Sequence, residues 1–201
     1  MQDVALDACC LINLCAAGRI LRMSSSSAAR TQGVARSRRT AGRCCGFGLG
    51  LHVPAKVTSE ALYIMQSDEE NPASLVECPI DLEPYVATGS LTPCDLETHD
   101  EIELFVQMAA QLGDGEAACF TLAAKRGWAL ATDDRRARRL AAESSLTVIT
   151  TPELVKVWAE NTHPSDEEIG TVLRNIQRFA YFTPRPTSPE YAWWMDHLAT
   201  S

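Results

Sequence analysis

Short apolar segments alternate with helix-like segments through the second half of the chain, and this alternation restricts the fold more than any other feature. WALAT (128–132) precedes the arginine-rich DDRRARRLAAES (133–144), and LTVIT (146–150) precedes TPELVKVWAEN (151–161). Short apolar runs are typical of buried strands, and the longer segments between them are typical of helices. Strands that are joined through helices run parallel, so the pattern predicts an α/β fold with a parallel sheet.

The first half of the chain continues this arrangement less regularly. Pro54 suits the first turn of a helix, so we expect a helix from there to about residue 65. An amphipathic helix at 100–112 is expected to turn four residues toward the core: Ile102, Phe105, Val106 and Ala109. The other predicted elements are strands at 4–6 and 48–53, a helix at 10–23, a helix that follows the GDG turn (113–115) and runs to 126 before a cap at Gly127, and short strands around a short helix near 82–88.

Charge is distributed unevenly along the chain. The net charge is −8, yet residues 8–59 contain eight Lys or Arg and no Asp or Glu, and the rest contains ten basic and 26 acidic residues. Within the basic part, 24–43 is rich in Ser, Arg and Gly, and we expect it to be a disordered basic loop. A basic arm beside an acidic body is compatible with binding to nucleic acid or to an acidic partner.

The cysteine pattern favours a reducing compartment. The eight cysteines include two adjacent pairs and show no CxxC or Cys/His zinc spacing. No convincing signal peptide is present, and no apolar segment approaches the ~20 residues that span a bilayer. We therefore expect a cytoplasmic protein with free thiols that pack as small core residues and no contact with a membrane.

Acidic residues follow the predicted strands at the positions where a parallel sheet binds its ligands. Asp7 follows the first strand, and Asp133 and Asp134 follow WALAT. Glu116 opens a helix, where a carboxylate is favoured by the helix dipole, and Glu60 lies on the helix after the second strand. The carboxyl ends of neighbouring parallel strands meet at one edge. Carboxylates gathered there would repel one another, and a hard cation such as Mg²⁺ or Mn²⁺ would relieve that repulsion.

Each of these residues also has a simpler interpretation. Asp7, Asp133 and Asp134 are favoured N-cap residues, and Glu60 and Glu116 are ordinary helix glutamates. We expect one of Asp133 and Asp134 to cap the following helix and the other to bind metal. The arginines after them are either a solvated helix face or contacts for RNA phosphate, with Arg135 and Arg138 as the candidates for RNA binding.

The acidic positions and their surroundings resemble the PIN domain family of metal-dependent ribonucleases, which includes the VapC-type toxins of bacterial toxin–antitoxin pairs. The resemblance covers 4–160 apart from the basic loop and is carried, in order, by LDACCLINL, VPAKVTSEAL, GDGEAACFTLAAKRG and LATDDRRAR. It implies a three-layer α/β/α fold with a central parallel sheet over residues 1–162, in which 24–43 is an insertion. Residues 163–201 would form a short helical, aromatic extension outside that domain.

The resemblance also implies roles for individual residues. The implied metal ligands are Asp7, Glu60, Glu116, Asp133 and Asp134, supported by Asn13 and Thr132. Catalysis would depend on Asp7, Glu116 and Asp134, with Asp133 replacing or assisting Asp134 and Asn13 supporting Asp7.

These expectations favour a Mg²⁺- or Mn²⁺-dependent endoribonuclease that hydrolyses single-stranded RNA and resembles a toxin. Such a protein could pair with an antitoxin and form a homodimer. Two other classes remain open at this point. One is a non-catalytic PIN-like binding or scaffold module, and the other is a metal-dependent DNA nuclease or phosphatase with the same acidic chemistry.

Overall fold

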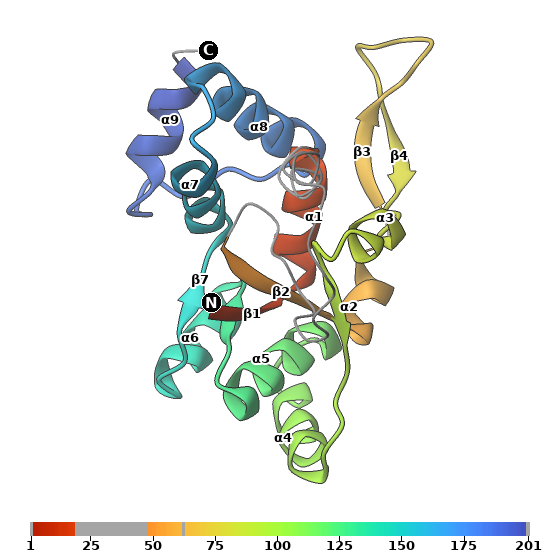
Figure 1. Cartoon of the computed structure of the whole chain (residues 1–201), viewed down its shortest axis with the longest axis vertical. Helices are drawn as coiled ribbons and strands as arrows, with labels where there is room; N and C mark the ends of the chain where they lie inside the picture. The colour runs from red at the N-terminus through yellow and green to blue at the C-terminus, as the bar shows by residue number, and fades with distance from the viewer. Residues whose placement is uncertain (1, 19–47, 62, 200–201) are drawn as a thin grey trace, which may run out of the picture.

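A sheet of five parallel strands forms the centre of the molecule (Figure 1). The computed structural model describes residues 2–18, 48–61 and 63–199, and its strand order across this sheet is β5–β2–β1–β6–β7. The strands are β1 (Gln2–Leu6), β2 (Leu49–Pro54), β5 (Thr92–Cys94), β6 (Ala129–Ala131) and β7 (Val148–Ile149). The predicted parallel α/β sheet is confirmed, because each neighbouring pair of strands in it is parallel.

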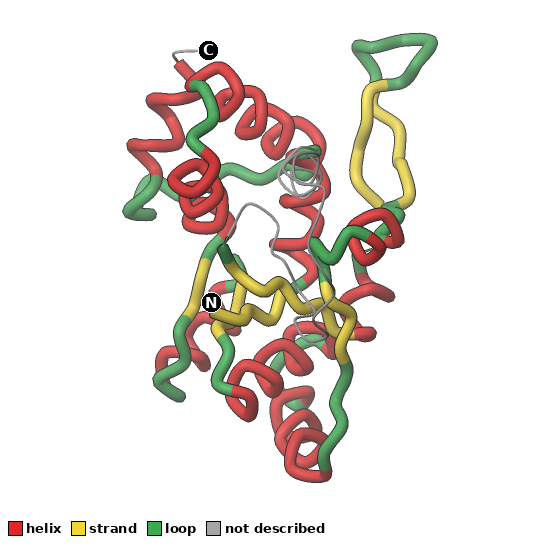
Figure 2. Tube along the Cα trace, in the orientation of Figure 1, coloured by secondary structure: helices red, strands yellow, loops and turns green. Residues whose placement is uncertain are grey.

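Helices cover both faces of the sheet, which gives the expected three layers (Figures 1 and 2). One layer consists of α1 (Ala8–Ala17), α7 (Thr151–Thr162), α8 (Asp166–Phe179) and α9 (Tyr191–Ala199). The opposite layer consists of α4 (His99–Ala109), α5 (Asp114–Arg126) and α6 (Arg135–Glu143). Two shorter helices, α2 (Ala55–Glu60) and α3 (Glu83–Ala87), follow β2 and β4 (Leu75–Pro79).

The register of β1 and β6 decides which residues meet at the edge of the sheet. Leu6 lies opposite Ala131, and the amide of Asp7 donates a hydrogen bond to the Ala131 carbonyl over 3.1 Å. Both strands end at this level, so residue 7 and residues 132–134 leave the sheet side by side.

Helix α5 packs closely on the sheet because its inner face carries small side chains. Ala117, Ala118 and Ala123 are buried, and the helix contacts β1, β2 and β6. The helix ends at Gly127, whose φ of 69° lies in the left-handed region that favours glycine. The predicted end of this helix is therefore confirmed, whereas the helix begins at Asp114, within the predicted turn. Its N-terminus points at the same edge as the end of β1.

The predicted helix from Pro54 to residue 65 is wrong beyond Glu60. Helix α2 ends there, and Tyr63–Ser67 instead forms β3, which pairs antiparallel with β4. The hairpin of β3 and β4 extends away from the sheet in Figure 1. β-Branched and aromatic residues such as Ile64 and Tyr63 favour a strand, and the hairpin partner lies outside the window in which helical periodicity is read.

The predicted inner face of α4 is also partly wrong. Ile102 and Val106 are 49% and 63% exposed, whereas Phe105 and Met108 are half-buried and pack against the core. Apolar residues occur around much of this helix, so periodicity did not determine which side faces inward. The side is determined by α5, against which α4 packs.

The C-terminal helices pack on the same core as the sheet. Ile169, Val172 and Ile176 of α8 and Trp194 of α9 are buried in one continuous cluster with the strand residues. Helix α8 contacts both α1 and β3. Residues 163–199, predicted as an extension, therefore contribute to the main hydrophobic core.

Some predictions fall on residues that the structure does not describe. Helix α1 ends at Ala17, and the predicted continuation at 19–23 lies outside the described residues, as do the basic segment 24–43 and Cys44 and Cys45. Among the helices of the described ranges, none combines the length and apolar character needed to cross a bilayer.

Candidate active site

Asp7 lies at the junction of β1 and α1 and accepts hydrogen bonds on both carboxylate oxygens. Its Oδ1 accepts from the amide of Ala8 over 2.7 Å, and its Oδ2 accepts from the Thr132 hydroxyl over 2.8 Å and from the Cys9 thiol over 3.2 Å. The side chain is 2% exposed, and burial raises the pKa of Asp7 despite these donors. Asp7 therefore caps α1, as the simpler interpretation holds, and at the same time faces the end of β6.

Asp134 caps the next helix with one oxygen only. Its Oδ1 accepts from the amides of Arg136 and Ala137 over 2.7 and 2.8 Å, and no described residue donates a hydrogen bond to its Oδ2. The Thr132 hydroxyl, which donates to Asp7, accepts from the amide of Asp134 over 3.2 Å. Thr132 thus positions Asp7 and Asp134 relative to each other.

Asp133 is directed toward α7 and α1. Its Oδ1 accepts from the amide of Thr151 over 3.0 Å, and its Oδ2 accepts from the Thr151 hydroxyl, from Asn13 Nδ2 over 3.3 Å and from the Cys10 thiol over 3.6 Å. Burial raises the pKa of Asp133, and the hydrogen bonds from Thr151 oppose that shift. Of the adjacent pair, Asp134 is the helix cap, as expected for one of the two, and Asp133 joins the end of β6 to two helices. Which of the two binds metal stays a prediction.

The prediction that Asn13 supports Asp7 is wrong. Asn13 donates to Asp133 and, over 2.9 Å, to the hydroxyl of Thr151. It lies nearly two helical turns along α1 from Asp7, where its side chain reaches the layer of α7 instead of the end of β1. Spacing along the sequence placed Asn13 on the correct helix but did not identify its partner.

Glu116 and Glu60 meet at the N-terminus of α5. The Glu116 carboxylate accepts from the amide of Gly113 over 3.2 Å, and Glu60 Oε1 accepts from the amide of Gly115 over 2.8 Å. Burial raises the pKa of Glu116, and the negative charges of Asp7, Asp134 and Glu60 add to that shift. A Cβ on residue 115 would collide with the Glu60 carboxylate, so glycine at this position permits the close approach.

These acids line one cleft. Its volume is about 1080 Å³, and Asp7, Glu60, Glu116, Asp133 and Asp134 all contribute to its wall. Arg138 lines the cleft as well, whereas Arg135 is exposed on α6 and does not. The sequence-predicted acids are thus brought together, although they come from four separate parts of the fold.

The opposite wall was not expected from the sequence. It is formed by residues of the segment between α8 and α9, including Phe182, Arg185 and Glu190. This segment has no regular secondary structure, and the only sequence signal for it is its proline content, which indicates a loop but not its position. Cys9, which touches Asp7, was also not singled out.

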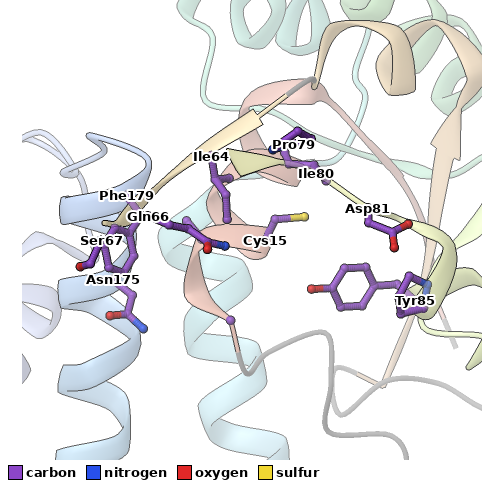
Figure 3. Close-up of a pocket in the computed structure, with 13 residues that line it drawn as sticks. Cys15, Ile64, Gln66, Ser67, Pro79, Ile80, Asp81, Tyr85, Asn175 and Phe179 are labelled. Atoms are coloured by element: carbon purple, nitrogen blue, oxygen red, sulfur yellow. The ribbon is translucent and has the colours of Figure 1, made fainter. Parts of the chain in front are cut away.

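A second, smaller pocket of about 540 Å³ lies away from these acids, between the end of α1, the hairpin and α8 (Figure 3). Gln66 and Cys15 lie near its centre in Figure 3, with Tyr85 and Asp81 on the side of α3. Asp81 is the only acid among the described residues that line it, and these residues therefore do not offer a set of carboxylates for a hard cation.

The donors of the acidic cleft fit a hard divalent cation. Asp7, Glu60, Glu116 and Asp134 offer only oxygen, and such ligands suit Mg²⁺ or Mn²⁺. The raised pKa values of Asp7 and Glu116 indicate that burial and mutual repulsion disfavour their charged forms. Among the described residues, the one group of three candidate ligand atoms within 4.8 Å of one another is Cys9, Cys10 and Asp133, so the other carboxylates are spaced more widely. Mg²⁺ usually keeps several of its waters, which can bridge such spacing.

Comparison with known proteins gives one match. A family model described as a PIN domain matches residues 53–187, about two thirds of the chain. The matched range contains Glu60, Glu116, Asp133 and Asp134, and it includes α8 and most of the second wall of the cleft, whereas Asp7 precedes it. No significant match was found among curated proteins or among solved structures.

Proposed function

The chain belongs to the PIN domain family, whose members are generally nucleases that bind a divalent metal, and on this premise we propose that it is a Mg²⁺- or Mn²⁺-dependent endoribonuclease. The observation that carries the proposal is the convergence of Asp7, Glu60, Glu116 and Asp134 on one cleft at the carboxyl ends of β1 and β6. Oxygen ligands at this edge of a parallel sheet suit hydrolysis of a phosphodiester bond.

The residues of the chain have distinct tasks in this proposal. Asp7, Glu116 and Asp134 would hold the cation, and a divalent cation there would supply Lewis acidity toward water and toward the phosphate. Thr132 orients the Asp7 carboxylate through its 2.8 Å hydrogen bond and contacts the amide of Asp134. Glu60 is held against the N-terminus of α5 and completes the negative wall. Asp133 accepts hydrogen bonds from α1 and α7 and so fixes the end of β6 against these two helices. In this proposal it supports the position of the neighbouring Asp134.

Cationic side chains at the cleft support an anionic polymer as substrate. Arg138 on α6 and Arg185 on the opposite wall both line the cleft, and each can contact a phosphate next to the scissile bond. Arg135 is exposed on the same helix as Arg138 and would bind RNA only beyond the cleft. We further propose single-stranded RNA as the substrate, because an extended strand places successive phosphates along an open cleft.

The toxin-like role is part of the same proposal. A toxin of this kind would be inhibited by an antitoxin and could form a homodimer. Co-purification of the chain with the product of a neighbouring small open reading frame, and loss of RNA cleavage in that complex, would support this role. Equal cleavage with and without that protein would argue against it.

The first experiment compares acid variants on single-stranded RNA with Mn²⁺. Asp7→Asn and Asp134→Asn are each expected to lower cleavage by about a hundredfold or more, because even partners behind a metal ligand are worth 10- to 100-fold. Asp114→Asn is the matched control, since Asp114 is an exposed acid beside Glu116 that does not line the cleft. Unchanged cleavage in both cleft variants, with the folds intact by circular dichroism, would refute the proposal.

The second experiment separates the catalytic role from the alternatives. Turnover of RNA, DNA and a phosphomonoester is measured on the same preparation, and RNA is expected to be the preferred substrate. In parallel, Mn²⁺ binding is expected to weaken in Glu116→Gln. Faster turnover of DNA or of the phosphomonoester would assign a different activity to the cleft. No turnover together with no effect of Glu116→Gln on Mn²⁺ would indicate a binding module.

A further inference from the structure

We propose that Cys9, Cys10 and Asp133 form a second cation site, selective for a thiophilic metal such as Zn²⁺, on the wall of the acidic cleft. Each of the three residues offers one ligand atom, and these atoms all lie within 4.8 Å of one another. Two sulfurs and one carboxylate oxygen are a donor set that suits Zn²⁺ and is unsuited to Mg²⁺. The site is therefore chemically distinct from the oxygen-only set of Asp7, Glu116 and Asp134.

One distance within this group matches an edge of a tetrahedral zinc site, and the others lie below 4.8 Å. In a tetrahedral zinc site, bonds of 2.0–2.3 Å give sulfur–oxygen edges of about 3.5 Å and sulfur–sulfur edges of about 3.8 Å. Cys10 Sγ lies 3.6 Å from Asp133 Oδ2, and Cys9 Sγ lies 3.2 Å from Asp7 Oδ2.

The first turn of α1 and two polar contacts position the two sulfurs. Cys9 and Cys10 lie in that turn, after the cap Asp7 and Ala8. The amide of Asp133 donates to Cys9 Sγ over 3.4 Å, and the Thr151 hydroxyl oxygen lies 3.4 Å from Cys10 Sγ. Cys9 is half-buried and lines the cleft, whereas Cys10 is fully buried behind it. A metal ion can therefore reach the site from the cleft and displace the weak sulfur contacts.

Occupation of this site would affect the neighbouring acids. Because Cys9 Sγ contacts the Asp7 carboxylate, a cation on the sulfur would draw Asp7 away from the oxygen-only set. Zinc is therefore expected to inhibit Mn²⁺-dependent RNA cleavage, a consequence that rests on the proposed function. Binding of the metal itself does not depend on that function.

The test uses the full chain, reduced and metal-free, titrated with Co²⁺ and then with Zn²⁺. Thiolate coordination of Co²⁺ is read from the charge-transfer absorption in the near ultraviolet, and Zn²⁺ affinity is read from displacement of Co²⁺. Binding should also release protons, because both cysteines bind as thiolates. Cys9→Ser is expected to remove most of the charge-transfer band and to weaken Zn²⁺ binding by at least about tenfold.

Controls separate this site from the other cysteines. Cys78→Ser changes a half-buried cysteine on β4, outside the cleft, and should leave the band unchanged. A Cys44→Ser, Cys45→Ser background removes the other adjacent pair and should also leave it unchanged. Cys10→Ala should act like Cys9→Ser, and circular dichroism establishes that each variant is folded.

The outcomes are distinguishable. A charge-transfer band of wild-type strength in folded Cys9→Ser, or no band in the wild-type protein, would overturn the site. A band that depends on Cys9 in a protein that cleaves no RNA under any metal condition would support the site and refute the nuclease. If the protein is active, half-inhibition by zinc should require at least about ten times more metal in Cys9→Ser than in wild type, each relative to its own zinc-free rate.

Discussion

Single glycine and acid residues determine where the carboxylates of the cleft lie. Gly115 is the sharpest case, because its amide donates to Glu60 Oε1 and a Cβ in its place would collide with that carboxylate. The neighbour that must move is the far end of a flexible side chain and not backbone. Gly115→Ala should therefore displace Glu60 without disturbing α5.

Gly115→Ala is expected to change Mn²⁺ affinity and protein stability to different extents. In Gly115→Ala, Mn²⁺ affinity is expected to fall by about 10- to 100-fold. The free energy of unfolding should change by less than about 1 kcal/mol, because alanine is the better helix former. Isothermal titration and urea unfolding measure the two quantities. In a Glu60→Gln background the substitution should have little further effect on affinity. A large additional loss there would show that Gly115 acts by some other route.

The buried acids also predict how the stability of the metal-free protein depends on pH. Burial raises the pKa values of Asp7, Glu116 and Asp133. Groups with raised pKa values stabilise the fold below the ordinary carboxyl pKa, and this stabilisation is lost as the pH rises through their folded values. Without metal, the free energy of unfolding should therefore fall on going from pH 5 to pH 7. The fall should be smaller in Asp7→Asn, and a fall of equal size would contradict the assignment.

For individual residues, the sequence predicted which acids line the cleft but not which side chains form hydrogen bonds with them. Asp7 could be predicted because it follows an apolar strand directly, and β1 does end there. Asp133 and Asp134 could not be distinguished, because both follow β6 and only the direction of the backbone sends one to α7 and leaves the other as the cap of α6. The partner of Asn13 depends on how α1 packs against α7, which no local pattern encodes.

Among the elements, α4 is fixed to α5 by a buried ion pair. Arg126 Nε donates to Glu101 Oε1 over 2.7 Å, and Arg126 Nη2 donates to Oε2 over 3.2 Å. Glu101 is 3% exposed and also accepts from the amides of Glu97 and Thr98, which completes the cap of α4. The hydrogen bonds from Arg126 lower the pKa of Glu101 to about 2.

This pair predicts a loss of stability that is confined to pH values above the carboxyl range. Glu101→Gln is expected to lower the free energy of unfolding at pH 7 by about 2–3 kcal/mol. The difference should shrink as the pH falls from about 4.5 toward 2, because a lowered pKa stabilises only the charged form. Urea unfolding at each pH measures this difference in the free energy of unfolding. The matched control is Glu103→Gln, which changes an exposed glutamate of the same helix. A loss that persists at pH 2 would argue against the ion pair as its source.

The elements that sequence predicted best are those whose ends carry their own signals. Gly127 ends α5, and apolar runs mark β1 and β6, so these could be placed from local sequence. The β3–β4 hairpin could not, because each strand is stabilised by the other and not by its own periodicity. The orientation of α4 likewise depends on a helix that lies elsewhere in the chain.

For the whole molecule, the C-terminal region is both part of the core and a wall of the cleft. Trp194 is fully buried and packs edge-on against Phe182, with 5.9 Å between ring centroids. Sequence separated 163–201 from the domain because its aromatic residues, Tyr191, Trp193 and Trp194, are equally compatible with covering the core, forming a dimer or binding a partner. Its position follows from long-range packing of α8 and α9, which a single sequence does not display.

This packing predicts that the region is required for stability. Trp194→Ala is expected to lower the free energy of unfolding by about 3–5 kcal/mol. Trp194→Phe should lower the free energy of unfolding by less than half of that amount. The indole Nε1 has no hydrogen-bond partner among the described residues, so removing the indole leaves no other polar group unpaired. Urea unfolding of the full chain measures both. Equal stability of Trp194→Ala and wild type would mean that α9 does not belong to the core.

We propose that acids from separate strands and helices hold one divalent cation, and anomalous scattering from Mn²⁺-soaked crystals would locate that cation. The predicted result is one strong peak in the acidic cleft, at about 2.1 Å from carboxylate oxygens of Asp7 and of Glu116 or Asp134, that disappears in Asp7→Asn crystals. A peak outside the cleft, a peak unchanged in Asp7→Asn, or no peak at saturating Mn²⁺ would contradict it.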